Sequence, residues 1–463
     1  MPVVKTAFFK PIFAIAFIFM LSFSITLWAQ EESSTDNHPV TFDENATAES
    51  LGLEPFEYKP SFSPDFFPLY PWDHLYDWAS RYQTMEDAIA GIADCGFNMA
   101  GFVDPEHVAL CEKKKLACIV RIKLNPETLK TISEEEMEQI VVEAIESTKD
   151  NEYVLGYYLM DEPGSYYFAG LGKAVAAIKK HAPGKLAYIN LFPGYASTIG
   201  ADAVSQLGTH SFTEYLERFV QEVKPQFISY DNYMTEYSDD MHNKERAAQY
   251  YNDLLEIRRI ALKYDLPFWN ITGCTRIQET SAPPSVARLA FQAYSTLGAG
   301  GKGLGWFTYY PLSWVYAPMN EEGKRTIIWQ YLRDINEQTK TLGLLMKDYV
   351  STGVYFTDPT PTPNLPTLPG TIVQSVEQTA SMRNAIPEIP PIMVGEFQTN
   401  DKETSAVMLV NCDLDHPAKV KLNLVADYQS IQIVSPIDGT LFDYDRDYGY
   451  WLLPGHGALF LLK

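Results

Sequence analysis

The chain has 463 residues, too many for one ordinary core, and length alone suggests two or three domains. Hydrophobic residues make up 46% of it and aromatic residues 13%, which excludes a disordered protein. With 59 acidic against 36 basic residues the net charge is −23, so the surface repels nucleic acid and anionic membranes.

The first 29 residues have the pattern of a signal peptide. Lys5 and Lys10 precede an apolar run over residues 11–28, and Ala29 supplies a small residue for cleavage. Because the run is long, an uncleaved anchor is the alternative. We expect a mature protein outside the cytoplasm, either secreted, periplasmic or at the cell surface. Residues 30–55 are polar and acidic and are expected to form a flexible leader.

Residues 56–347 alternate between predicted strands and helices. The predicted strands are short, apolar and bounded by turns, as parallel strands buried on both faces are. They cover residues 66–70, 98–102, 117–122, 154–160, 186–190, 227–230, 267–271 and 303–308, and a helix follows each. Eight such units favour a (β/α)8 TIM barrel. An open doubly wound sheet is disfavoured, because no Gly-rich phosphate-binding loop follows the first strand.

The composition changes after residue 347. Residues 358–370 and 386–391 are rich in proline and resist helix formation. Apolar residues then alternate with a period of two in segments 394–397, 406–410, 420–424, 431–434, 450–453 and 458–462. This pattern predicts a small all-β sandwich of seven or eight antiparallel strands over residues 348–463.

Two adjacent carboxylates, Asp161 and Glu162, follow the fourth predicted strand. TIM-barrel enzymes work at the carboxyl ends of their strands. Glycoside hydrolysis needs a protonated carboxylic acid beside the leaving oxygen, and burial among aromatic residues would raise the pKa of Glu162. We therefore predict that Glu162 is a general acid and that Asp161 assists it. The alternative is that both residues cap the next helix.

Four segments of the barrel resemble clan A glycoside hydrolases, most of all family 42-type β-galactosidase-like proteins. They are residues 154–163 (VLGYYLMDEP), 187–193, 228–233 and 301–309, and residues 453–459 resemble the sandwich appended to many such enzymes. The resemblance implies that the strand-four glutamate, here Glu162, is the acid/base. It also implies a nucleophilic glutamate at the end of strand seven. Residues 268–274 (FWNITGC) contain no carboxylate and depart from that pattern.

Asp231, at the end of strand six, and Glu279, in the loop after strand seven, are the candidates for a second catalytic carboxylate. A separation of about 6.5–9.5 Å from Glu162 would make the enzyme inverting, and about 5–5.5 Å would make it retaining. Non-adjacent strands four and six favour the wider gap, which would make Asp231 the general base of an inverting enzyme, but the sequence does not fix the distance. The alternative for Asp231 is a supporting hydrogen-bond acceptor.

Other polar and aromatic residues at the strand ends are candidates for carbohydrate contact, with packing as the alternative for each. They are Trp72, Asp73, Asn190, Tyr233, Asn270, Trp306 and Tyr309. Asp104 is expected to be the N-cap of a helix that begins with Pro105. No HExxH motif or His cluster occurs, so we expect neither a metal nor a cofactor.

The sequence favours a glycoside hydrolase that cleaves an extracellular oligo- or polysaccharide by carboxylate acid/base catalysis. A non-catalytic carbohydrate-binding barrel is the alternative, supported by the missing strand-seven glutamate. A polysaccharide lyase is disfavoured, because no basic set accompanies the candidate base Tyr233. The expected partner is a carbohydrate, with neither nucleic acid nor membrane bound by the mature chain.

Overall fold

The structure is a computed structural model. It describes residues 42–56, 66–77, 79–202, 204–236, 241, 245–277, 281, 283–312, 316–378 and 389–463. The expected signal peptide and Glu279 lie outside the described residues. Within the described ranges, no helix is long and apolar enough to cross a membrane.

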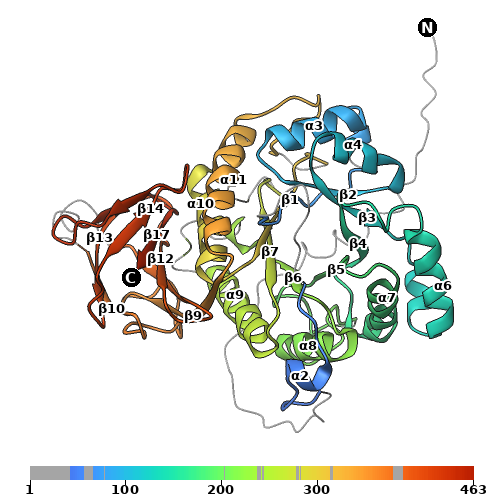
Figure 1. Ribbon diagram of the computed structural model, residues 1–463, viewed down its shortest axis with the longest axis horizontal. Coiled ribbons are helices and arrows are strands. Elements are labelled where there is room, and N and C mark those ends of the chain that lie inside the picture. The colour runs from blue at the N-terminus through green and yellow to red at the C-terminus, as the bar shows by residue number, and fades with distance from the viewer. Residues whose placement is uncertain are drawn as a thin grey trace. The chain divides into compact units, whose positions relative to one another are not determined.

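Eight parallel strands form the barrel that the sequence predicts, and each predicted strand overlaps an observed one (Figure 1). They are β1 (Leu69–Pro71), β2 (Met99–Val103), β3 (Ala117–Arg121), β4 (Val154–Asp161), β5 (Leu186–Leu191), β6 (Ile228–Asp231), β7 (Phe268–Gly273) and β8 (Gly303–Phe307). Their order is β1-β8-β7-β6-β5-β4-β3-β2. A bridge between His74 and Phe102 joins β1 to β2 and closes the ring.

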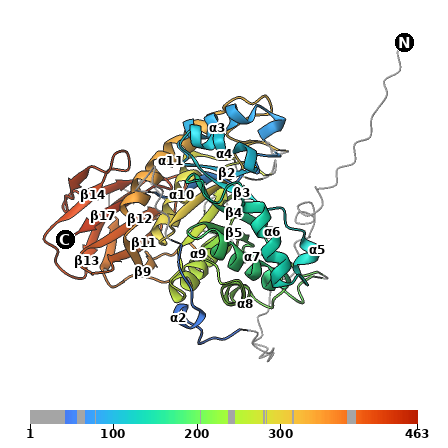
Figure 2. The same ribbon diagram turned by 45° about the vertical axis from the view of Figure 1, so that its right-hand side comes forward.

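Helices surround the strands (Figures 1 and 2). They are α3 (Met85–Asp94), α4 (Val108–Lys113), α5 (Pro126–Leu129), α6 (Glu134–Ile145), α7 (Phe168–His181), α8 (Phe212–Arg218), α9 (Glu245–Lys263), α10 (Val286–Gly298) and α11 (Ile327–Leu345). Ser133 and Glu136 form a capping box at the start of α6, each side chain bonded to the other's backbone N–H. Local side-chain contacts therefore fix where this helix begins.

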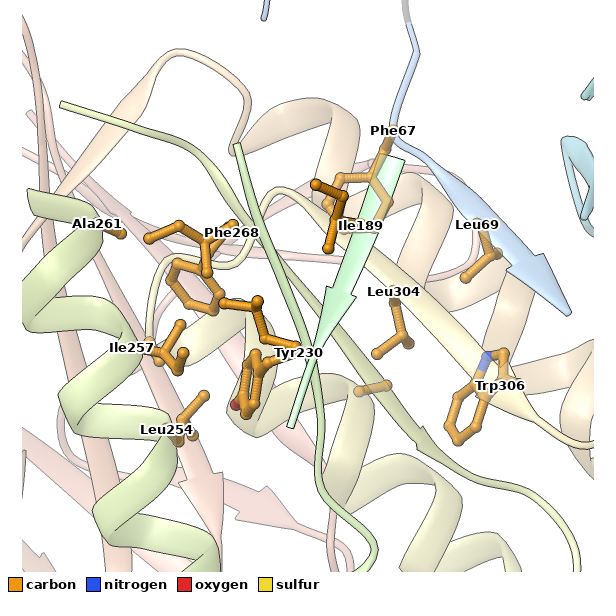
Figure 3. Packing of buried hydrophobic residues seen from close by; sticks show 14 of the residues in the cluster. Phe67, Leu69, Ile189, Tyr230, Leu254, Ile257, Ala261, Phe268, Leu304 and Trp306 are labelled. Carbon is orange, nitrogen blue, oxygen red and sulfur yellow. The ribbon is translucent and has the colours of Figure 1, made fainter. Parts of the chain in front are cut away.

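Side chains alternate between the helix-facing and the inward-facing sides of each strand. Tyr230 of β6, for example, lies beside Leu254 and Ile257 of α9 (Figure 3). The barrel interior is filled mainly by rings, among them Tyr70, Trp72, Phe102, Tyr158, Tyr188 and Trp269. This alternation decides which residue of each strand reaches the catalytic end of the barrel.

Part of the segment expected to be a flexible leader is ordered. Residues 42–56 contain the short helix α2 (Ala48–Leu51), which Thr47 caps in a capping box with Ser50. The Phe56 backbone N–H donates to the Gln226 carbonyl at 2.9 Å, next to the start of β6. Capping and this backbone contact thus place residues 42–56 against the barrel.

The C-terminal domain consists of two antiparallel sheets, as predicted (Figure 2). One sheet has the order β15-β14-β17-β12-β11-β9 and the other β10-β13-β16. The strands are β9 (Tyr349–Phe356), β10 (Val373–Gln378), β11 (Ile392–Thr399), β12 (Ser405–Asn411), β13 (Ala418–Leu424), β14 (Ile431–Val434), β15 (Leu441–Asp443), β16 (Tyr450–Leu452) and β17 (Gly457–Leu462). The sheets share an apolar core, and helix α10 packs against β11, β12 and β17.

Candidate active site

Four polar side chains from three neighbouring strands meet at the carboxyl end of the barrel. The amide of Asn190 on β5 donates to Asp161 Oδ1 at 3.1 Å and to Asp231 Oδ2 at 2.8 Å. The carboxyl groups of Glu162 and Asp231 lie within hydrogen-bonding distance of each other. Asp161 and Glu162 remain partly exposed, whereas Asp231 and Asn190 are buried. The structure thus brings four predicted site residues together.

The backbone after β4 turns Glu162 into this cluster. Its N–H continues the pairing with β5 by donating to the Asn190 carbonyl at 2.8 Å. Its φ of +43° then places it in the left-handed region, which is uncommon for a residue with a side chain. Such outliers concentrate at functional sites, because surrounding structure must hold them.

The close approach of the acids controls which of them carries a proton. Burial raises the pKa of Glu162 well above its usual value, and the charges of Asp231 and Asp161 raise it further. Burial, followed by the charge of Asp161, also raises the pKa of Asp231. Two carboxyl groups in contact do not both ionise readily. Burial and mutual charge therefore favour a proton on the pair, and the Asn190 amide, which donates to Asp231 Oδ2 at 2.8 Å, favours Asp231 as the ionised partner.

The carboxyl groups of Glu162 and Asp231 contact each other across β5, although their strands are not adjacent. In a TIM barrel, inward side chains from alternate strands share a layer, so residues from β4 and β6 meet across β5. Asn190 of β5 bonds to both Asp161 and Asp231 and fixes this arrangement.

A chain of hydrogen bonds runs from Asn190 into the barrel core. The Ser229 hydroxyl donates to Asn190 Oδ1 at 3.1 Å, and it pairs with the Tyr188 hydroxyl at 2.7 Å. The Tyr188 and Tyr70 hydroxyls lie 2.6 Å apart. Since the Asn190 oxygen accepts from Ser229, its NH2 group must face the carboxylates. The barrel interior thereby sets the orientation of the amide that holds the acids.

Aromatic rings adjoin the acids on the β6 and β8 side. The Tyr233 hydroxyl lowers the pKa of Asp231, and its ring lies 5.0 Å from that of Phe307 between centroids. The Tyr233 backbone N–H donates to the Tyr195 hydroxyl at 3.3 Å. The structure thus places Tyr233 at the site, with Phe307 as the inward-facing aromatic of β8. Sequence reasoning missed Phe307 and Tyr195.

Three predicted contact residues face the helices instead. Trp306 donates from Nε1 to Asn336 at 2.9 Å, and the Tyr309 hydroxyl accepts from Trp329 at 2.8 Å, both on the α11 side. Asn270 donates to the Thr296 hydroxyl of α10 at 2.9 Å. Successive residues of a strand point to opposite sides, so the side chains of these residues pack between strand and helix while adjacent residues in the chain face inward. The structure does not bring them to the acids.

Asp73 and Trp72 are buried after β1. Asp73 accepts from the backbone N–H groups of Tyr309 and Tyr310 at 2.8 and 3.1 Å, which ties the β1 loop to the β8 loop. Burial raises the pKa of Asp73 to about 7. Trp72 packs edge-on against Phe102, with centroids 4.5 Å apart. Both side chains are therefore buried at the end of β1.

Two further buried acids, Asp253 and Glu236, hold loops around the site. Asp253 of α9 accepts from the Gly194 N–H at 2.9 Å and from the Asn232 amide at 2.8 Å. Glu236, after β6, accepts from the Ile277 N–H at 3.0 Å. Burial raises the pKa of Asp253 to about 7 and that of Glu236 to about 8. Within the described ranges, no group of three or more His, Cys, Asp or Glu residues is arranged to hold a metal.

These acids make stability depend on pH. Asp73, Asp253 and Glu236 have folded-state pKa values above their unfolded values, so they stabilise the fold fully only at low pH. That stabilisation is lost as pH rises through about 7 to 8. We expect the free energy of unfolding, measured in urea, to fall by roughly 2–3 kcal/mol between pH 6.5 and 8.

Asp253→Asn is a matched variant that tests how much Asp253 contributes to the fall of unfolding free energy with pH. Both donors meet the same oxygen, Oδ2, so an amide oxygen there keeps the two hydrogen bonds and removes the titration. The variant should show a shallower loss of stability over the same pH range. A flat or rising profile in the unaltered protein would contradict the expected burial of these acids.

Solved structures of glycoside hydrolases have a fold similar to that of this chain. No protein-family model matches the chain, and no curated protein matches it. A family 5 glycoside hydrolase from Bacteroides vulgatus is similar at a TM-score of 0.52, with 13% identity, over 90% of this chain and 95% of that one. A second structure, described as a glycoside hydrolase, has a TM-score of 0.52 with 12% identity, over 90% and 98%. At such identity the likeness shows the fold.

Proposed function

We propose that this protein is a glycoside hydrolase in which Glu162 is the general acid. One observation carries the proposal: the carboxyl groups of Glu162 and Asp231 meet at the carboxyl end of a TIM barrel, where burial and neighbouring charge raise the pKa of both. Hydrolysis of a glycosidic bond begins with transfer of a proton to the departing oxygen. A carboxylic acid that is kept neutral by burial and by neighbouring charge is suited to that step.

Asp231 is the second carboxylate of the proposed reaction. In the free protein it accepts the proton of Glu162, so a glycosidic oxygen that enters the site would take its place as acceptor. Asp231 then bears a negative charge next to the sugar. Positive charge develops on the sugar ring in the transition state, and this carboxylate would stabilise it. Tyr233 and Asn190 hold Asp231 for that role.

The substrate class and location are part of the same proposal. The N-terminal targeting pattern and the resemblance to family 42-type proteins support an oligo- or polysaccharide outside the cytoplasm. The test is a screen of neutral glycans for release of reducing ends, with Glu162→Gln as the inactive control. Release of sugar by the unaltered protein and not by the variant is expected. Absence of release from every glycan would reject the proposal.

A non-catalytic carbohydrate-binding barrel is the second candidate. The absence of a carboxylate from β7, which ends in Gly273, favours it. A binding protein would retain glycan affinity and show no turnover, before and after the change at Glu162. Direct binding and sugar release, measured on the same samples, separate the two functions.

The pH–rate profile gives a further prediction. After burial, the charge of Asp231 is the largest cause of the raised pKa of Glu162, ahead of Asp161. Asp231→Asn should lower the pKa of Glu162, so the alkaline limb of kcat/KM should move to lower pH. Asp161→Asn should move it in the same direction and by less. If neither change moves the limb, Glu162 is not the acid that titrates there.

A further inference from the structure

A second polar cluster lies at the carboxyl ends of β2 and β3. Arg121, the last residue of β3, donates from Nε and Nη2 to the two oxygens of Asp104 at 2.9 and 2.8 Å. Asp104 is the residue before a short helix that begins at Pro105, as predicted, but its side chain does not cap that helix. The carboxylate turns to Arg121 instead. Both side chains keep some exposure, 20% for Arg121 and 15% for Asp104.

Rings surround this ion pair. The guanidinium carbon of Arg121 lies 3.5 Å from the centroid of the Tyr76 ring. His74 stacks on the Tyr76 ring, with ring centroids 5.4 Å apart and an angle of 16° between the ring planes. His74 also lies 5.4 Å from the ring of Tyr158. We call Tyr76, His74, Asp104 and Arg121 the polar corner.

Tyr158 connects the polar corner to the acids. It is the inward-facing ring of β4, four residues before Glu162. The charges of Asp161, Glu162 and Arg121 all act on its hydroxyl, as does Tyr76. His74 of the polar corner thus contacts a ring of β4, the strand that ends in Asp161 and leads into Glu162.

The chemistry of the corner matches a sugar ring. A guanidinium–carboxylate pair offers N–H donors and oxygen acceptors side by side in one plane, which suits two adjacent hydroxyl groups. The mutual neutralisation of Arg121 and Asp104 leaves little net charge to attract an ionic group.

We propose that the polar corner binds adjacent hydroxyl groups of a neutral sugar unit next to the bond that Glu162 protonates. The inference rests on the proposed function and adds specificity-determining residues to it. Arg121 donates to one hydroxyl, Asp104 accepts from its neighbour, and Tyr76 fixes the guanidinium plane.

Binding in an inactive background tests the polar corner. The Glu162→Gln protein is titrated with cellopentaose, mannopentaose, xylopentaose and galactopentaose by calorimetry. Arg121→Lys and Asp104→Asn, each added to it, should weaken the tightest of these complexes by about tenfold or more. The double change should weaken it by less than the product of the two single effects, because the side chains act together.

A control variant and a second measurement separate binding from folding. Arg259→Lys alters another two-point Arg–carboxylate pair, to Glu256 on the outer helix α9, and should leave affinity unchanged. Melting temperatures identify any variant that loses affinity only because it unfolds. Unchanged affinity in folded Arg121→Lys and Asp104→Asn overturns the inference, as does failure of all four pentaoses to bind. Binding without turnover by the unaltered protein, which keeps Glu162, would instead reject the proposed function alone.

Discussion

Glu162→Gln is expected to lower kcat by about 10²–10⁴, the usual contribution of a general acid. Glutamine has nearly the same shape and keeps hydrogen bonding to the neighbouring Asp231, but it has no proton to give to a leaving oxygen. Glycan affinity should therefore survive while turnover falls. Initial rates of reducing-sugar release, together with calorimetric binding of the same glycan, measure the two effects separately.

The control for Glu162→Gln is the same substitution at a glutamate that does not lie at the carboxyl end of the barrel. Glu135 lies exposed in the first turn of α6, and Glu135→Gln should leave kcat within a factor of two or so. An activated substrate adds a second check. A good leaving group needs no protonation, so Glu162→Gln should retain more of its activity on an aryl glycoside with an acidic phenol. Equal losses on both substrates would contradict the role of Glu162 as the acid.

The barrel could be predicted from the sequence because its strands are buried on both faces. Such strands appear as short apolar runs, and their regular alternation with helical segments favours one architecture. The same property hides the direction of each side chain. Nothing in an apolar run indicates which residue faces inward, so Trp306 and Asn270 were assigned to the site although they face α11 and α10. Phe307, one residue later, faces inward.

The acids were easier to predict than their mutual geometry. Asp161, Glu162, Asn190 and Asp231 stand out because polar side chains at the ends of apolar strands need a reason to be there. Their contacts depend on the stagger of the barrel, which sequence does not reveal. The pairing of Arg121 with Asp104 was missed for the same reason, since the partners come from different strands.

The sandwich strands show a similar limit. The predicted alternation found β11, β12, β13, β14, β16 and β17, which have a buried face. It missed three edge strands: β15 (Leu441–Asp443), whose three residues are all exposed, β10 (Val373–Gln378), which has one buried residue, and β9 (Tyr349–Phe356). An edge strand with no buried face has no period-two pattern to detect.

Glu396 in β11 should give the largest loss of stability among substitutions in the C-terminal domain. Its side chain is fully buried and accepts four hydrogen bonds. Oε1 accepts from the N–H groups of Ile372 and Val373 at 3.0 and 2.7 Å. Oε2 accepts from the N–H and hydroxyl of Thr371 at 2.9 and 2.8 Å. One carboxylate of the larger sheet thus holds the turn that leads into β10 of the smaller sheet.

Glu396→Gln should cost about 3–5 kcal/mol of unfolding free energy, because an amide has one acceptor oxygen where four donors converge. Its NH2 group must face either the Ile372 and Val373 N–H groups or the Thr371 N–H and hydroxyl. The hydroxyl can turn to accept from the amide, but at least one buried N–H loses its acceptor. Urea unfolding measures the loss, and hydrogen exchange of residues 371–373 should accelerate first. Glu377→Gln, at an exposed position of β10, should change stability by less than about 0.5 kcal/mol. Equal effects of the two changes would mean that the Glu396 carboxylate does not join the sheets.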